Sequence, residues 1–221
     1  RQPKHPELFS FKHHYITQAM DSDVMATLFE AIHGHRYITV DNYGKHSNEV
    51  RTVRLVPLKL YISAQNGRQN LLAFHEKANR LNSYRLDYMS SIRIEDEICE
   101  KFNALRAALR KAEAHMWGVN CKWSIRHVEH VEFEIKIEDD EQFIVQRLER
   151  GKRCGRVEKI DDNHYRYVAE VFDTTEMLPW IRTFISRITR MNFSNRTAEN
   201  RFKADIQEMY RMYGIDGGDA Q

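Results

Sequence analysis

The chain has 221 residues, a length that allows one large domain or two small ones, and 42% of them are hydrophobic, enough to bury a substantial core. A formal net charge of +2 excludes the strong global basic field that drives nonspecific binding to nucleic acids, although it leaves room for a local basic pocket. The three cysteines are odd in number, lie far apart and include no CxxC pair, so they suggest neither a zinc knuckle nor a disulfide framework and favour a reducing cytoplasm.

The N-terminal segment is expected to be a linker. Residues 1–20 contain Pro3 and Pro6, and two prolines so close together favour an extended chain over a helix start. The first residue is Arg1 rather than Met, so we expect a longer parent chain. No apolar run approaches the roughly 20 residues of a membrane span, and we expect no membrane contact.

A helix followed by short strands is predicted next. Asp21 is a capping residue in front of an apolar helical stripe (Val24, Leu28, Ala31, Ile32) that Gly34 ends. Pro57 interrupts the second predicted strand and indicates an edge position or a bend, and Asn66-Gly67 is a strong hairpin signal. Four or five strands with tight turns predict a small barrel or a strongly curled sheet. The predicted strands cover residues 36–43, 50–62, 71–74 and 83–94.

A long connecting helix is predicted over residues 96–118, with Gly118 as its C′ residue. Its apolar positions recur in steps of four and three, the narrow stripe of a helix that packs along another element. We place the boundary between two domains here and expect the stripe to contribute to a dimer interface. The stripe consists of Ile98, Phe102, Leu105, Leu109, Ala112 and Met116.

Residues 122–214 predict a second domain with the element order β-α-β-β-α-β, that of a ferredoxin-like sandwich. Its first strand alternates clearly over 131–138, Gly151 stops a short helix, and Asp173 with Glu176 predicts a capping box for the next helix. Two strands are expected over about 155–172, a last strand at 191–193, and a final helix closed by Gly214. The helix after Asp173 is expected to bury one face, formed by Met177, Ile181, Phe184, Ile185 and Ile188. The apolar positions of the other two helices are Phe143, Ile144, Leu148, Phe202, Ile206, Met209 and Tyr213.

Taken together, these stretches resemble the WYL family. In that family a first strand ends in Tyr and is followed by a V-x-P-L-x-L strand, a W-Y-L strand and an F-R-L-D-R-I strand. The corresponding residues here are 38–43 (ITVDNY), 53–60 (VRLVPLKL), 70–75 (NLLAFH) and 84–87 (YRLD). Residues 11–16 are similar to the linker of such regulators. Asp173-Thr174 before Pro179-Trp180-Ile181 is similar to the C-terminal extension called WCX, so the resemblance covers nearly the whole chain.

The resemblance implies an α+β chain with an Sm-like β-barrel WYL domain at 21–95, the connecting helix at 96–118 and the WCX domain at 122–214. It implies the effector-sensing and dimerising region of a bacterial transcription regulator. Such a region forms a homodimer and reaches DNA through an N-terminal helix-turn-helix that this chain lacks. No GxSxG, P-loop, GxGxxG or HExxH motif occurs, so we expect neither an enzyme nor a cofactor.

Two departures from the family pattern bear on the ligand. The W-Y positions are Gln69 and Asn70, and the second Arg of the R-L-D-R strand is Tyr88. Family members bind ligands through basic and aromatic residues. A chain that has lost some of them is therefore expected to recognise a different ligand, or none.

Four residues are the ligand-binding candidates: Tyr43, Asn70, His75 and Arg85. Arg85 on a short strand offers a bidentate fork for a carboxylate or phosphate, or else it pairs with Asp87. Tyr43 stacks on a ligand ring or packs internally, His75 donates to an anion when protonated or is simply solvated, and Asn70 offers one donor and one acceptor group. If 84–94 is one strand, Tyr88 lies on the face opposite Arg85, in the core or an interface.

Metal binding is not expected. His33-x-His35 and His127-x-x-His130 lack a Cys or carboxylate partner at a recognised spacing. The basic run at 147–153 is interleaved with acids and is interpreted as the C-terminal turn of a helix. Two alternatives to an effector-binding region for a small anionic or nucleotide-like ligand stay open: a direct single-stranded nucleic-acid binder, and a structural dimerisation domain with a degenerate pocket.

Overall fold

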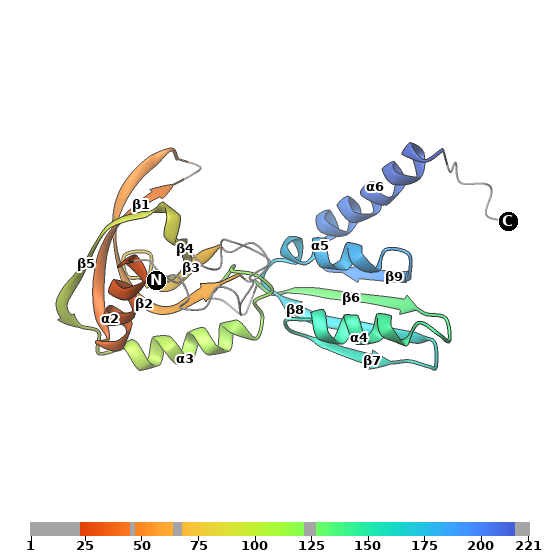
Figure 1. The fold of residues 1–221 in the computed structure, drawn as a ribbon, viewed down its shortest axis with the longest axis horizontal. Helices are drawn as coiled ribbons and strands as arrows, with labels where there is room; N and C mark the ends of the chain where they lie inside the picture. Colours follow the sequence, from red (N-terminus) through yellow and green to blue (C-terminus); the bar gives the residue numbers. More distant parts are fainter. Residues whose placement is uncertain (1–22, 45–46, 64–67, 122–126, 215–221) are drawn as a thin grey trace, which may run out of the picture. The chain divides into compact units, whose positions relative to one another are not determined.

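The computed structural model describes residues 23–44, 47–63, 68–121 and 127–214 (Figure 1). The expected linker at 1–20, the cap Asp21 and the Asn66-Gly67 turn lie outside these residues. The described residues form two compact units. Unit 1 contains those up to Glu113 together with Cys121, and unit 2 contains 114–120 and 127–214. No helix among the described residues is long and apolar enough to cross a membrane.

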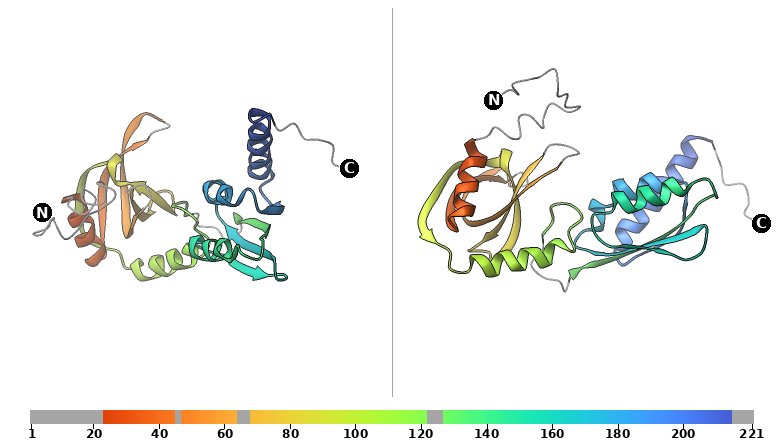
Figure 2. Two further views of the ribbon diagram at one scale, coloured as in Figure 1. Left: turned by 45° about the vertical axis from the view of Figure 1, so that its right-hand side comes forward. Right: turned by 60° about the horizontal axis from the view of Figure 1, so that its bottom comes forward.

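Unit 1 is built on a five-stranded antiparallel sheet in the order β4-β3-β2-β1-β5. Its hydrogen-bonded ladders join each neighbouring pair, and among the described residues no ladder joins β4 to β5. The predicted small barrel is therefore not closed, and the curled sheet is the correct form (Figure 2). The strands are β1 (Arg36–Gly44), β2 (Glu49–Ile62), β3 (Gln69–His75), β4 (Arg80–Arg85) and β5 (Met89–Ile98).

Helix α2 (Asp23–His33) covers one face of this sheet, as its apolar stripe predicted. Leu28 and Ala31 are fully buried and share a core with β1 and β2, while Ile32 is partly buried at its margin. Gly34 follows the helix, but the residue with a left-handed backbone is His35, with φ of 54°. The ring of His35 stacks on the ring of Phe102, the first residue of the next helix, with centroids 4.0 Å apart.

The bend predicted at Pro57 is present, but the edge position is wrong. β2 lies between β1 and β3, and the β2–β3 register shifts between Pro57 and Lys59. A bulge of this kind accommodates the missing N–H of proline inside a central strand.

The predicted connecting helix is shorter than expected, because α3 spans Phe102–Glu113. Ile98 belongs to β5 and is 61% exposed, and Gly118 lies beyond the end of the helix. Within the helix the stripe is correct, since Phe102, Leu105, Leu109 and Ala112 are buried, whereas Met116 is buried but lies beyond the end of α3. The helix contacts β2, so unit 1 itself covers much of the stripe that suggested a dimer interface.

Unit 2 has the predicted order β-α-β-β-α-β, with a further helix after it. Its antiparallel sheet has the order β7-β8-β6-β9, and α4 and α5 pack on one face around Phe133 and Tyr167. The first unit and this one together hold five α-helices within the described residues. The elements of unit 2 are β6 (Glu129–Lys136), α4 (Gln142–Gly151), β7 (Arg156–Lys159), β8 (His164–Val171), η3 (Thr174–Glu176), α5 (Leu178–Ile181), η4 (Arg182–Phe184), β9 (Ile188–Phe193) and α6 (Arg196–Met212).

Three apolar residues at the ends of predicted helices in unit 2 are not buried helix positions in the structure. Phe143 is 59% exposed and Tyr213 is 74% exposed, while Ile188 starts β9 instead of ending a helix. The helix expected after Asp173 is divided into three short pieces, η3, α5 and η4. Met177, between η3 and α5, is buried in the core together with Ile181 and Phe184, as the helical spacing predicts, although the helix is not continuous.

Glu176 does not complete a capping box. Asp173 caps the turn, accepting from the Thr175 N–H at 2.9 Å, whereas the Glu176 carboxylate accepts from the backbone N–H groups of Gly118 (2.9 Å) and Val119 (3.2 Å). Burial raises the pKa of Glu176 and these backbone donors partly offset that rise. A Cβ on residue 118 would lie 2.6 Å from the Glu176 carboxyl carbon, so a side chain there would displace the carboxylate from these donors.

Candidate functional site

The region around Arg85 differs from the predicted continuous strand. β4 ends at Arg85, a one-turn 3-10 helix η1 (Leu86–Tyr88) follows, and β5 begins at Met89. Leu86 and Met89 are both buried in the core of unit 1. A spacing of three between buried residues suits a 3-10 turn, in which positions i and i+3 share a side, whereas alternation would put them on opposite faces.

This turn brings Tyr88 next to Arg85. The guanidinium carbon of Arg85 lies 4.3 Å from the centroid of the Tyr88 ring, a cation–π contact. The expectation that Tyr88 lies on the opposite face is therefore wrong, because η1 redirects the side chains that follow Arg85. The second Arg of the family motif is thus replaced by an aromatic platform for the first.

Asp87 occupies part of the Arg85 fork. Arg85 Nε donates to Asp87 Oδ1 at 2.9 Å, and Arg85 Nη2 pairs with Asp87 Oδ2. This is the internal pairing that the sequence left open as an alternative to ligand binding. The hydrogen bond to Asp87 raises the pKa of Arg85, so the guanidinium keeps its charge throughout the physiological range.

Tyr43 and Asn70 lie with this group. The rings of Tyr43 and Tyr88 meet edge to face with centroids 5.7 Å apart, and the Tyr43 hydroxyl donates to Asn48 Oδ1 at 2.5 Å. Asn70 is only 4% exposed and is paired directly with Arg85 across the β3–β4 ladder. Directly opposed residues share one face of an antiparallel sheet, so Asn70 and Arg85 project from the same side.

Tyr61 is a further residue that the sequence did not single out. It is paired with Asn70 across the β2–β3 ladder and so shares the face of Asn70 and Arg85. The bulge near Pro57 shifts the β2–β3 register, and although Pro57 indicates a bend, the sequence does not reveal which residue of β3 is then paired with Tyr61. We name Tyr43, Tyr61, Asn70, Arg85 and Tyr88 the Arg85 face.

His75 does not belong to the Arg85 face. It ends β3, five residues beyond Asn70, which is roughly 17 Å by the rise of a strand. Its Nδ1 accepts a hydrogen bond from the Ala78 N–H at 3.2 Å, so the ring supports the turn into β4. The structure therefore separates His75 from the other three candidates.

A second polar cluster in unit 1 surrounds Arg54 on β2. Its guanidinium pairs with Glu76 and Glu97 at 2.6 Å, donates through Nε to Glu95 at 2.9 Å, and covers the Tyr37 ring at 3.8 Å. These partners come from β1, β5 and the turn after β3. One cation satisfies groups from several elements, so the cluster ties the sheet together and is a weaker ligand candidate than the Arg85 face.

The basic run at 147–153 is used inside unit 2. Arg147 donates to the Thr183 carbonyl at 2.7 Å and lies over the Phe184 ring, and Arg153 donates to the Trp117 carbonyl at 2.9 Å. Among the residues that the structure describes, no group of three His, Cys, Asp or Glu side chains is arranged to hold a metal ion.

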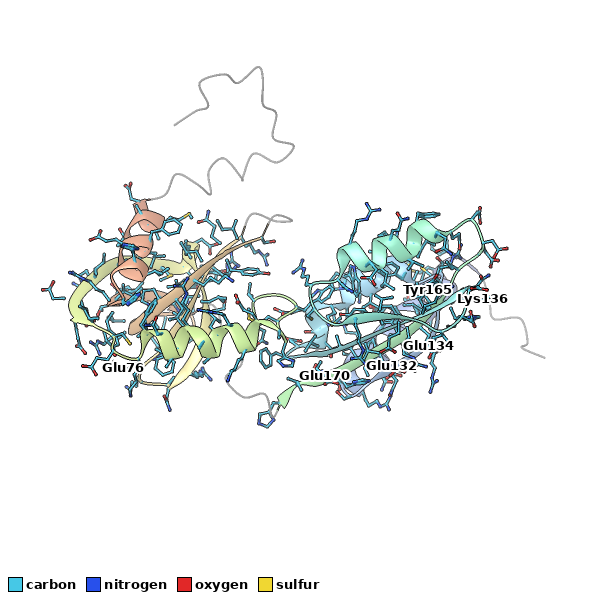
Figure 3. All side chains as sticks on the ribbon, turned by 90° about the horizontal axis from the view of Figure 1, so that it is seen from below. Glu76, Glu132, Glu134, Lys136, Tyr165 and Glu170 are labelled. Carbon is cyan, nitrogen blue, oxygen red and sulfur yellow. The ribbon has the colours of Figure 1, made fainter. Side chains whose placement is uncertain are left out.

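The face of the unit 2 sheet opposite its core is charged. Figure 3 shows Glu132, Glu134 and Lys136 along β6, with Glu170 on the neighbouring strand β8. His130 lies among these acids, its Nδ1 2.7 Å from Glu170 Oε1 and its Nε2 3.5 Å from Glu132 Oε2. The hydrogen bond to Glu170, with a smaller contribution from Glu132, raises the pKa of His130.

The contribution of His130 to the stability of unit 2 is expected to decrease as the pH rises above 6.5. A raised folded-state pKa means that the charged ring stabilises the fold fully below the unfolded value of 6.5 and loses that effect as the pH rises through the folded value. The free energy of unfolding of wild type should therefore fall relative to His130→Gln over that range. Urea titrations from pH 5.5 to 9 measure it, and Glu170→Gln should remove most of the difference. Parallel curves for wild type and His130→Gln would contradict the assignment.

Residues 23–94 match the family model of the WYL domain. The chain is also similar to the structure of proteasome accessory factor B/C (PafBC) of Arthrobacter aurescens, at 13% identity and a TM-score of 0.39, over 92% of this chain and 28% of that one. It is similar to a structure described as a CRISPR Cas-related protein, at 14% identity and a TM-score of 0.55, over 89% of this chain and 53% of that one. No curated protein sequence matches closely enough to name a relative.

This chain covers less than two thirds of the length of either of these structures. The similarity to the CRISPR Cas-related protein concerns the fold alone. The family match is more specific, because it covers α2 and the sheet up to residue 94 of β5 and contains every residue of the Arg85 face. Residues 23–94 are therefore a WYL domain.

Proposed function

We propose that this WYL domain binds a small anionic or nucleotide-like effector on the Arg85 face. The observation that carries the proposal is the stacking of the Arg85 guanidinium on Tyr88, whose ring also meets the Tyr43 ring edge to face. A guanidinium recognises phosphate or carboxylate oxygens through its planar fork, and tyrosine rings offer surfaces for a base or another planar group. The two kinds of group therefore suit the two ends of a nucleotide-like ligand.

The wider role follows from the family resemblance. We infer that the chain is the effector-sensing and dimerising region of a bacterial transcription regulator, with unit 2 as the WCX extension. In this proposal effector binding changes how two protomers present N-terminal helix-turn-helix heads to two DNA half-sites. This role requires no chemical step on the ligand, so we propose that the chain binds its ligand and does not act as an enzyme.

Replacing Arg85 with alanine is expected to weaken effector binding at least tenfold, because a charge-assisted bidentate contact contributes on the order of 1.5–3 kcal/mol. Calorimetric titration with adenosine 5′-monophosphate and inorganic phosphate measures the loss, and uncharged adenosine tests the contribution of the rings. Arg156→Ala is the matched control, because Arg156 also pairs with an acid two residues on, Glu158, but lies on β7 of unit 2. Equal affinities of wild type and Arg85→Ala would refute the proposal.

A direct single-stranded nucleic-acid binder is the second candidate, favoured by the three tyrosines of the Arg85 face. The salt dependence of the binding affinity distinguishes a nucleic-acid binder from an effector-binding domain. A protein that follows a strand neutralises several phosphates and loses affinity steeply with ionic strength, whereas a compact site for one small anion loses little. Titration with an octathymidylate between 50 and 200 mM salt distinguishes them.

A further inference from the structure

Asp87 stands in the place where an anionic ligand would bind. It holds two nitrogens of the Arg85 guanidinium, Nε through Oδ1 at 2.9 Å and Nη2 through Oδ2. This is the side-on, two-point contact through which arginine recognises carboxylates and phosphates most strongly. The Arg85 face is therefore electrically balanced at its main anion-binding group before any ligand arrives.

We propose that Asp87 is an internal counter-ion that a ligand anion must displace from Arg85. The proposal rests on the proposed function, since it concerns the same site. It assigns to Asp87 the role of setting the ligand concentration at which the domain responds. It also restricts the site to ligands whose anionic group, such as a phosphate, binds a guanidinium more strongly than the Asp87 carboxylate does. A group that binds the guanidinium more weakly does not displace Asp87.

The two partners differ in how freely they move. The Asp87 side chain is 58% exposed, so it can turn into water and be solvated there. The Arg85 side chain is 33% exposed and is held against the Tyr88 ring. Buried Leu86 and Met89 anchor the chain on both sides of Asp87, so its release requires a side-chain rotation and leaves η1 in place. After that rotation the guanidinium still lies on its aromatic support.

Asp87→Asn tests the proposal, because the amide keeps the shape of the side chain and removes the charge. Exposed ion pairs contribute up to about 1 kcal/mol, so removing the competitor should tighten binding of adenosine 5′-monophosphate and inorganic phosphate roughly fivefold. Adenosine, which carries no anion, should bind unchanged. Asp87→Glu retains a competing carboxylate and should stay near wild type. Glu158→Gln is the matched control, since it breaks the equivalent pair with Arg156 in unit 2.

The outcomes distinguish this inference from the proposed function. If Arg85→Ala loses binding while Asp87→Asn binds no more tightly than wild type, Asp87 is not a competitor and only this inference fails. Weaker binding by Asp87→Asn, with circular dichroism and Tm unchanged, would show that Asp87 positions Arg85 and would also overturn it. Binding gained by Asp87→Asn where wild type shows none would support it. If neither protein binds either phosphate probe, the proposed function fails as well.

Discussion

Replacing Gly155 with alanine is expected to lower the free energy of unfolding of unit 2 by about 3 kcal/mol. Gly155 has a φ of +75°, a left-handed conformation that costs a residue with a Cβ about 1–2 kcal/mol. A Cβ there would also lie 2.5 Å from the Val168 carbonyl oxygen and 2.7 Å from the Ala169 Cβ. Both neighbours belong to β8, to which β7 is paired, so relief requires the two strands to separate.

Gly214→Ala is the matched control for this substitution. Gly214 also has a positive φ, of 63°, but an added Cβ meets nothing within 4 Å. Its loss should stay within the conformational part alone, about 1–2 kcal/mol. Urea titration followed by tryptophan fluorescence suits the comparison, since Trp117 and Trp180 pack together in the core of unit 2. Equal losses for the two variants would show that the contact with β8 is not what requires glycine.

Replacing Glu199 with alanine is expected to lower the free energy of unfolding of unit 2 by about 2–4 kcal/mol. Glu199 lies in the first turn of α6 and is 3% exposed. Its carboxylate accepts the Phe193 N–H at 3.0 Å and pairs with Arg196 at 2.7 Å and Lys203 at 2.6 Å. Alanine leaves a backbone donor at the end of β9 without its partner, in addition to removing two ion pairs.

The pH dependence of this effect has a definite sign. Burial raises the pKa of Glu199, but Lys203, the Phe193 N–H and Arg196 outweigh it and the net pKa is lowered. The stabilisation is therefore present above the unfolded value of 4.5 and is lost as the pH falls through the folded value. The difference between wild type and Glu199→Ala should shrink on acidification below pH 4.5. Glu208→Ala, which breaks an exposed pair with Arg211 on the same helix, should leave the free energy of unfolding nearly unchanged. A similar loss for both variants would contradict the role given to Glu199.

The order of elements could be predicted from the sequence because burial leaves a periodic pattern in the chain. Val131, Phe133 and Ile135 are buried and the residues between them lie on the charged face, as their alternation predicted. The stripe of α3 is buried from Phe102 to Ala112 for the same reason. Ends of elements were predicted less well, since a terminal residue such as Ile98 or Phe143 fits the period whether or not a neighbour covers it.

The candidate site was predicted in part. Tyr43, Asn70 and Arg85 come together as a group, and the family pattern is the signal that selected them. The alternation of residues 84–94 predicts the wrong face for Tyr88, because the three-residue turn η1 interrupts the strand there. The local sequence does not single out Tyr61, because its position beside Asn70 depends on the pairing of β2 with β3 and on the register shift within that pair.

The sequence by itself determined the α+β class, the two successive sets of elements and the amphipathic face of most of them, because these depend on neighbours a few residues apart. Only the tertiary structure decided that the first sheet stays open between β4 and β5, that His75 lies apart from Arg85, and that Asp87 occupies part of the Arg85 fork. Each of these depends on which distant strands pair and on where a turn redirects the chain. Periodicity along the sequence carries no record of either.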